Sequence, residues 1–169
     1  GIYAPDSNIT IIGSGTFSAV THDAAIYCSN LTIGDGTEQN ATNVSCESFG
    51  ACIIVKYNMI VNDYSTVWAC ANGPIVGMNG IYVEGSLYVN GTNTTVEGRA
   101  TYRPVKGECT NYTHYRPKNL TSGGYFNNAG STIAGIMVYG ILTVDGSKVE
   151  GNVFKEIYKP QEYDSEYTS

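Results

Sequence analysis

The residues of this sequence with the clearest chemical signature are asparagines followed two positions later by Ser or Thr. Such triplets accept N-linked glycans, and a chain of this composition would carry roughly three by chance. This one carries eight, at Asn8, Asn30, Asn40, Asn43, Asn90, Asn93, Asn111 and Asn119. The excess predicts a densely N-glycosylated, extracellular protein. The alternative is that Asn and Thr are simply plentiful turn and strand residues.

Cysteine is the second residue type that can do chemistry here. The five cysteines are Cys28, Cys46, Cys52, Cys70 and Cys109. They form no Cys-x-x-Cys pair and no His cluster has zinc spacing, so we expect no metal site. In an oxidising compartment they predict two disulfides and one leftover thiol. Cys46 and Cys52 could clip a short loop, but the spacing leaves the connectivity open.

Catalytic residues are harder to find. The two histidines, His22 and His114, stand in no recognisable Ser-His or Cys-His arrangement. Glu84, Glu97 and Glu150 recur in Val-Glu-Gly units, which fits solvent-facing strand positions better than the paired carboxylates of a glycosidase. The Gly-Asp turns lack the ligand spacing of a calcium loop. The sequence therefore predicts no enzyme, no catalytic residue and no cofactor.

Charge and hydropathy exclude two further classes of partner. The formal net charge is −6 and the pI is about 4.7, which argues against a nucleic-acid surface because neutralising phosphates needs clustered Lys and Arg. No run of about 18 apolar residues is present, so we expect no membrane span. The sequence starts directly in strand-like residues, which predicts a processed, mature form.

Short β-branched segments separated by Gly, Asn and Asp must position these residues. The strongest runs from Cys52 to Val61 and is predicted to form a hairpin with 65–71, which places Trp68 as a core anchor. Residues 81–102 and 132–158 predict two more hairpins, turning at Asn90-Gly91 and Asp145-Gly146. Helical periodicity is absent.

The two predicted hairpin regions 81–102 and 132–158 resemble one another in sequence. The segment from Gly85 through Val96-Glu97-Gly98 matches the one from Gly140 through Val149-Glu150-Gly151, and 31–37 is a fainter copy. We interpret this as a repeat of hairpins whose copies lie too far apart for a short-period solenoid. The resulting expectation is an all-β fold, a single antiparallel sandwich or barrel-like domain of pilin-like or Ig-like type.

The N-terminal segment is predicted to stand apart from this body. Residues 1–20 read as a strand interrupted by Pro5 and by Gly13/Gly15, without a turn-linked partner beside it. The expected division is an N-terminal strand over 1–20, a β-sandwich body over 21–159 and a polar tail over 160–169. The N-terminal strand must pair far away in its own sheet or in another molecule.

In overall character the chain resembles the subunits of archaeal cell-surface filaments, most closely the thread pilins of Sulfolobales. The likeness lies in the strand segments 9–12 and 16–20, the all-β body, the density of glycan acceptors and the lack of a type IV pilin helix. It implies head-to-tail filaments of identical subunits in which an N-terminal strand completes the next subunit's sheet. The donor residues would be Ile9, Thr10, Ile11, Ile12, Phe17 and Val20.

This resemblance implies a structural subunit of an extracellular filament coated with covalent N-glycans, with a role in adhesion or biofilm contact. A rival hypothesis is a monomeric secreted carbohydrate-binding or adhesin domain that stacks sugars on its tyrosines, at positions 82, 88, 102, 112, 115, 125 and 139. A secreted hydrolase would need a cleft with convergent carboxylates.

Overall fold

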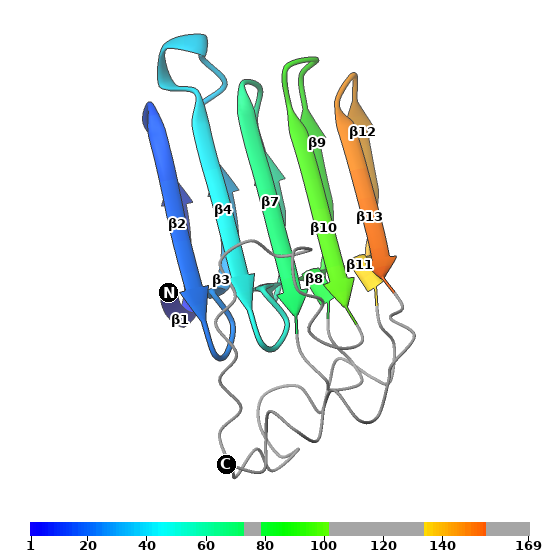
Figure 1. The fold of residues 1–169 in the computed structure, drawn as a ribbon. Coiled ribbons are helices and arrows are strands. Elements are labelled where there is room, and N and C mark those ends of the chain that lie inside the picture. Colours follow the sequence, from blue (N-terminus) through cyan, green and yellow to red (C-terminus); the bar gives the residue numbers. More distant parts are fainter. Residues whose placement is uncertain (73–78, 102–133, 155–169) are drawn as a thin grey trace, which may run out of the picture.

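Two parallel β-sheets make up the described part of the protein. The structure, a computed structural model, describes residues 1–72, 79–101 and 134–154 (Figure 1). Sheet 1 contains β1 (Ile2–Ile11), β3 (Ile26–Ile33), β5 (Ile53–Val55), β6 (Met59–Val61), β8 (Asn79–Val83), β9 (Leu87–Asn90), β11 (Ala134–Val138) and β12 (Leu142–Asp145). Sheet 2 contains β2 (Gly15–Thr21), β4 (Thr42–Ser48), β7 (Ser65–Asn72), β10 (Thr95–Thr101) and β13 (Lys148–Phe154). A single 3₁₀ turn, η1 (Glu38–Asn40), completes the described secondary structure.

The chain passes through the two sheets alternately, and each passage through both is one coil. Coil 1 is β1 and β2, coil 2 is β3 and β4, coil 3 is β5 to β7, coil 4 is β8 to β10, and coil 5 is β11 to β13. Every strand pairing is parallel and joins one coil to the next. Because parallel neighbours need a crossover, each coil crosses over through the opposite sheet. The result is a β-solenoid.

The expected antiparallel sandwich with an N-terminal donor strand is therefore wrong. A type I′ hairpin turn requires positive φ at both central residues. Gly91 has φ of 88°, but Asn90 is not among the positive-φ residues, where Tyr64 is the single described non-glycine. Asn90 ends β9 in sheet 1 and Thr95 begins β10 in sheet 2. The Asn-Gly dipeptide turns a corner between sheets and does not reverse a strand within one.

The sequence repeat is real, but its copies are stacked coils and not hairpins. Leu87 pairs with Leu142 and Val89 with Val144, as β9 and β12 lie side by side. In sheet 2 the two Val-Glu-Gly units are also in register, since Val96 pairs with Val149. The interpretation that these copies are too distant for a solenoid is corrected, because residues 55 positions apart are neighbours in space.

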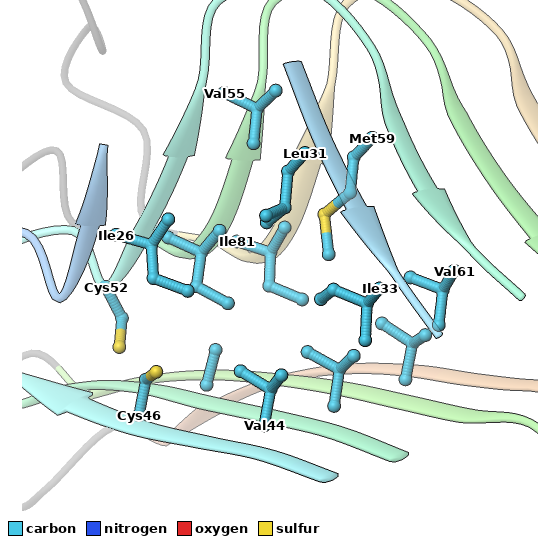
Figure 2. Packing of buried hydrophobic residues seen from close by; sticks show 14 of the residues in the cluster. Ile26, Leu31, Ile33, Val44, Cys46, Cys52, Val55, Met59, Val61 and Ile81 are labelled. Atoms are coloured by element: carbon cyan, nitrogen blue, oxygen red, sulfur yellow. The ribbon is translucent and has the colours of Figure 1, made fainter. Parts of the chain in front are cut away.

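Inward-facing side chains form columns that run along the stack. One column is isoleucine in all five coils: Ile2, Ile26, Ile53, Ile81 and Ile136. A second runs Ile9, Leu31, Met59, Leu87 and Leu142, and a third Phe17, Val44, Val67, Val96 and Val149. Figure 2 shows members of these columns from the middle coils, among them Ile26, Leu31 and Val44, in the space between the sheets. Each fully buried one contributes about 1.5–3 kcal/mol.

A ladder of polar side chains runs along the bend of sheet 1. Asn30 donates from Nδ2 to Asn8 Oδ1 at 2.8 Å and accepts the backbone N–H of Asn58 at 3.0 Å. Asn58 Oδ1 accepts the N–H of Ser86 at 3.0 Å, and Ser86 Oγ accepts the N–H of Ile141 at 3.1 Å. The ladder satisfies backbone groups that the bend leaves without a strand partner.

Candidate functional site

The two ends of the coil stack are the parts of the described structure where regular packing stops. At the N-terminal end, β1 pairs only with β3 and β2 only with β4 among the described strands. The inward side chains of Ile9, Ile11 and Phe17 are only partly buried against the core. A shallow hollow opens beside them, lined by Ile11, Ile12, Gly13, Ser14, Gly15, Thr16, Phe17 and Thr42.

At the opposite end, coil 5 leaves apolar columns open. Leu142 is 48% exposed and Val144 is 44% exposed, although both stand in inward-facing columns. Their neighbours one coil earlier, Leu87 and Val89, are fully buried. In the described residues, β11, β12 and β13 each pair on one side only, with β8, β9 and β10. This end therefore presents both apolar surface and unpaired strand edges.

The residues at the two ends match column by column. Ile136 shares a column with Ile2, Leu142 with Ile9, and Val144 with Ile11. In sheet 2, Val149 shares a column with Phe17, and Gly151 with Ala19. The five inward positions of coil 5 therefore correspond one by one to inward positions of coil 1, and all are apolar side chains except Gly151, which has none.

The residues predicted to form a donor strand lie in this first coil and pair within their own chain. Ile9, Thr10 and Ile11 pair with β3, while Phe17 and Val20 pair with β4. Ile9, Ile11 and Phe17 pack against the core, whereas Ile12 and Val20 are 60% and 50% exposed. The strand completes the protein's own sheets, so its free edge, and not the strand itself, is available to another copy.

The predicted glycan acceptors fall into two groups. Asn8, Asn43 and Asn93 are exposed. Asn30, Asn40 and Asn90 are half-buried, and each donates an amide hydrogen bond, to Asn8, to Asp35 at 2.6 Å and to Asn62 at 3.3 Å respectively. Asn111 and Asn119 lie outside the described residues. In the two pairs that lie close together in the sequence, Asn40/Asn43 and Asn90/Asn93, the first residue is hydrogen-bonded in a corner and the second is exposed.

The cysteines are mostly buried thiols in the described structure. Cys28, Cys46 and Cys52 are free and fully buried, while Cys70 is disulfide-bonded. Burial raises the pKa of the Cys28 thiol to about 11, which keeps it protonated and unreactive near neutral pH. Cys109 lies outside the described residues.

The remaining titratable candidates are engaged in local interactions. Glu97 accepts a hydrogen bond from Arg99 Nε at 2.6 Å, and Glu150 pairs with Lys148 at 3.1 Å. Glu84 is exposed, and the His22 ring stacks on Phe49 with a centroid distance of 5.3 Å. His114 lies outside the described residues. Over the described ranges, no group of three or more His, Cys, Asp or Glu could hold a metal ion.

Trp68 is not the core anchor that the sequence predicted. It is half-buried on the outward side of sheet 2, in register with Ser45 and Glu97. The inward neighbours on either side of it, Val67 and Ala69, are the buried residues. Strand alternation explains the difference, because successive side chains point to opposite faces.

Tyrosines occur on the outside of sheet 1 but do not form a row in one register. Tyr3, Tyr27 and Tyr82 share a position with Ile54 and Met137, and Tyr82 is only 5% exposed. Tyr57 and Tyr139 follow the ends of β5 and β11. Tyr3 meets Tyr27 edge to face at 5.5 Å, and Tyr82 meets Tyr139 at 5.8 Å. Tyr3 and Tyr57 are each 59% exposed and Tyr139 is 62% exposed. Burial raises the pKa of Tyr82 to about 12, with the Glu84 carboxylate and Tyr139 adding to the effect, so its ring stays neutral. Of the other predicted sugar-binding tyrosines, only Tyr88 lies within the described ranges, where it is half-buried.

Sequence reasoning missed the polar ladder and the open ends. A signal for the ladder was present, since Asn30, Asn58 and Ser86 are spaced 28 residues apart. The open ends carried no separate signal, because their residues are of the same types as those of the buried coils.

Comparison with known proteins identifies no relative. No family model, no curated protein and no solved structure matches the chain. The resemblance to thread pilins therefore remains a prediction. In the parts of the chain that the structure describes, no helix is long and apolar enough to cross a membrane.

Proposed function

We propose that this protein is a structural subunit that assembles head to tail, with coil 5 of one copy stacked on coil 1 of the next. The observation that carries the proposal is the exposure of inward-facing columns at both ends, with Leu142 and Val144 nearly half exposed while Leu87 and Val89 are fully buried. A heterologous contact of this kind does not close on itself, so it propagates into a filament.

Stacking would satisfy two requirements of the open ends at once. The unpaired edges of β12 and β13 would gain the hydrogen bonds of a parallel ladder from the edges of β1 and β2. The exposed apolar side chains of Leu142, Val144 and Val153 would be covered, at roughly 25 cal/mol for each Å² of apolar surface removed from water. The proposed filament is one continuous solenoid, without an exchanged strand.

The experiment that tests this proposal compares a charge placed at the end with a charge placed on the side. Val144→Lys puts an ammonium group into the junction, where it would have no partner. Thr66→Lys puts the same group on the exposed lateral surface of coil 3. We expect the wild type and Thr66→Lys to form filaments by negative-stain microscopy, while Val144→Lys remains a folded monomer by light scattering. A wild type that stays monomeric at high concentration contradicts the proposal.

We propose an extracellular, cell-surface location for the filament, with covalent N-glycans on its sides. Support comes from the exposure of Asn43 and Asn93, which leaves these acceptors accessible away from the two ends of the stack. The half-buried Asn30, Asn40 and Asn90 should stay unmodified because their amides are used in corners and ladders. Glycopeptide mass spectrometry of native material checks this, and glycans confined to the half-buried group would contradict it.

A second candidate function, carbohydrate binding, is favoured by the exposure of Tyr57 and Tyr139, which are 59% and 62% exposed. Exposed aromatic rings of this kind offer apolar faces on which a sugar can stack. Affinity electrophoresis with soluble polysaccharides tests this: Tyr57→Ala with Tyr139→Ala should abolish retardation, and Thr66→Ala should not. Retardation that survives the double substitution rules this surface out.

A further inference from the structure

Cys46 and Cys52 face one another at the corner where sheet 2 returns to sheet 1. Cys46 lies in β4 of coil 2, and Cys52 immediately precedes β5 of coil 3. Both side chains are fully buried. Figure 2 shows their two sulfur atoms pointing toward one another, and the two thiols are within hydrogen-bonding contact.

The space around this thiol pair is made by small residues in the neighbouring coils. The column of Cys46 otherwise holds only Ala19, Ala69, Gly98 and Gly151. Closer to the C-terminal end, the two sheets nearly touch at the same corner. A Cβ placed on Gly80 would lie only 2.6 Å from the carbonyl oxygen of Ala69. The cysteines thus occupy a part of the corner that is wide enough for two sulfur atoms, between opposite walls of the solenoid.

Hydrogen bonds fix the short chain segment that joins the two cysteines. Ser48 Oγ donates to the carbonyl oxygen of Gly50 at 2.6 Å, and the Phe49 N–H donates to that of Thr21 at 3.2 Å. The N–H of Cys52 donates to the carbonyl oxygen of Asn79 at 3.0 Å. Because the backbone is held on both sides, the thiols stay close together, which disulfide geometry requires.

We propose that Cys46 and Cys52 are a modification site, at which thiol–disulfide exchange with a small-molecule disulfide installs a bond across the corner. One cysteine thiolate attacks the small disulfide and releases one small thiolate, leaving a mixed disulfide. The second cysteine thiolate attacks the protein sulfur of that mixed disulfide and releases the other small thiolate. The two cysteines are oxidised, the small disulfide is reduced to two thiols, and the two cysteine protons end on those thiols.

The exchange takes place during folding and not in the folded protein. Burial holds the pKa of the Cys52 thiol well above its usual range, and the neighbouring Cys46 thiol raises it further. Since the thiolate is the attacking species, the folded pair reacts slowly at neutral pH. Exchange is therefore expected while the chain folds, before burial closes the pair off from the small disulfide. The inference does not depend on filament assembly.

A single tryptic peptide tests the proposal. Residues 1–56 contain no Lys or Arg before Lys56, so this peptide carries Cys28, Cys46 and Cys52 and excludes Cys70. Unglycosylated protein is refolded in a mixture of oxidised and reduced glutathione, alkylated in denaturant and digested. We expect the wild-type peptide to take one alkyl group, compared with three when it is refolded under reducing conditions.

Matched variants identify which cysteines are bonded. The peptide should take two alkyl groups in Cys46→Ala and in Cys52→Ala, and none in Cys28→Ala. Three alkyl groups on the oxidised wild-type peptide, or glutathione retained on Cys46 or Cys52, would overturn the proposal. Fragmentation of the wild-type peptide gives the same answer without any variant: an alkylated Cys28 confirms the pairing, and an alkylated Cys46 or Cys52 refutes it.

Discussion

The middle and the ends of this solenoid are built from the same residues but differ in what covers them. Leu87 and Leu142 share one column and Val89 and Val144 another, yet the coil 4 members are fully buried while the coil 5 members are 48% and 44% exposed. Residue type therefore does not distinguish a core position from an interface position here. What distinguishes them is whether a further coil lies alongside, which makes each end a surface that accepts another coil.

The largest expected effect is a difference in the free energy of unfolding between a middle position and an end position of the same column. Leu87→Ala should lower the free energy of unfolding by about 2–5 kcal/mol, because it opens a cavity in a fully buried site. Leu142→Ala should cost less than about 1 kcal/mol in the monomer, because this side chain is already half solvated. Urea unfolding of dilute protein checks both. Equal losses would show that the end is as tightly packed as the middle.

Glycine positions offer the next comparison. Gly91 has φ of 88°, and a Cβ there would overlap Cγ of Asp63 on the adjacent coil. Gly91→Ala should destabilise the fold by about 1–3 kcal/mol, since both the backbone and the coil contact are strained. Gly15, in the corner of coil 1, has nothing within 4 Å of its Cβ position, so Gly15→Ala should be nearly neutral. Thermal unfolding distinguishes the two, and a neutral Gly91→Ala would argue against this corner.

The polar ladder gives a third comparison. Asn58 Oδ1 accepts the N–H of Ser86 in an exposed hydrogen bond, so Asn58→Ala removes this partner and should cost about 0.5–1.5 kcal/mol. Asn8 stands at the end rung and accepts only the side-chain amide of Asn30 in the ladder, so Asn8→Ala should cost about 1 kcal/mol or less. Amide hydrogen exchange at Ser86 should accelerate in Asn58→Ala alone. Unchanged exchange there would contradict the ladder.

The smallest expected effect is on the thermal stability of the protein at acidic pH. Although burial raises the pKa of Asp63, hydrogen bonds from Asn93, Tyr64 and Thr94 outweigh it and hold this pKa below its ordinary value of 3.8. A carboxylate with a depressed folded pKa stabilises the fold above its unfolded pKa, and this stability is lost as the pH falls through the folded value. Melting temperature should therefore fall on acidification below 3.8, and by less in Asp63→Asn. Identical acid profiles would show that this carboxylate plays no part.

Part of this fold could be predicted from the sequence. Strands lie in several of the predicted segments, the chain bends at Asn90-Gly91 and Asp145-Gly146, and the segments after Gly85 and Gly140 do match. β4 was not predicted, and the predicted single run from Cys52 to Val61 is two strands, β5 and β6. Their arrangement was not, because alternating strands joined by glycine turns are common to hairpins and to solenoid coils. The structure separates the two by its parallel pairing, by the placement of β9 and β10 in different sheets, and by the backbone at Asn90, which lacks the second positive φ.

The coil period was hidden by two irregularities. The corner of coil 3 uses Asn62, Asp63 and Tyr64, with Tyr64 at φ of 56°, where coil 4 has Asn-Gly, so the middle copy of the repeat did not look like its neighbours. The interval from Ser86 to Ile141 is 55 residues, about two coil lengths, so the 28-residue spacing is broken at its last step. The open ends could not be predicted, since exposure depends on stacking and not on residue type.

The most direct test of head-to-tail stacking is a disulfide cross-link between copies. Ile141 in coil 5 and Asn8 in coil 1 stand at the two ends of the same ladder. Stacked coils are about 4.8 Å apart, which is within the Cα separation that a disulfide spans. In the double variant Ile141→Cys with Asn8→Cys, mild oxidation should yield a series of covalent multimers on a non-reducing gel, and Ile141→Cys with Thr66→Cys should not. A double variant that remains monomeric, or multimers of equal yield in the control, would contradict the account.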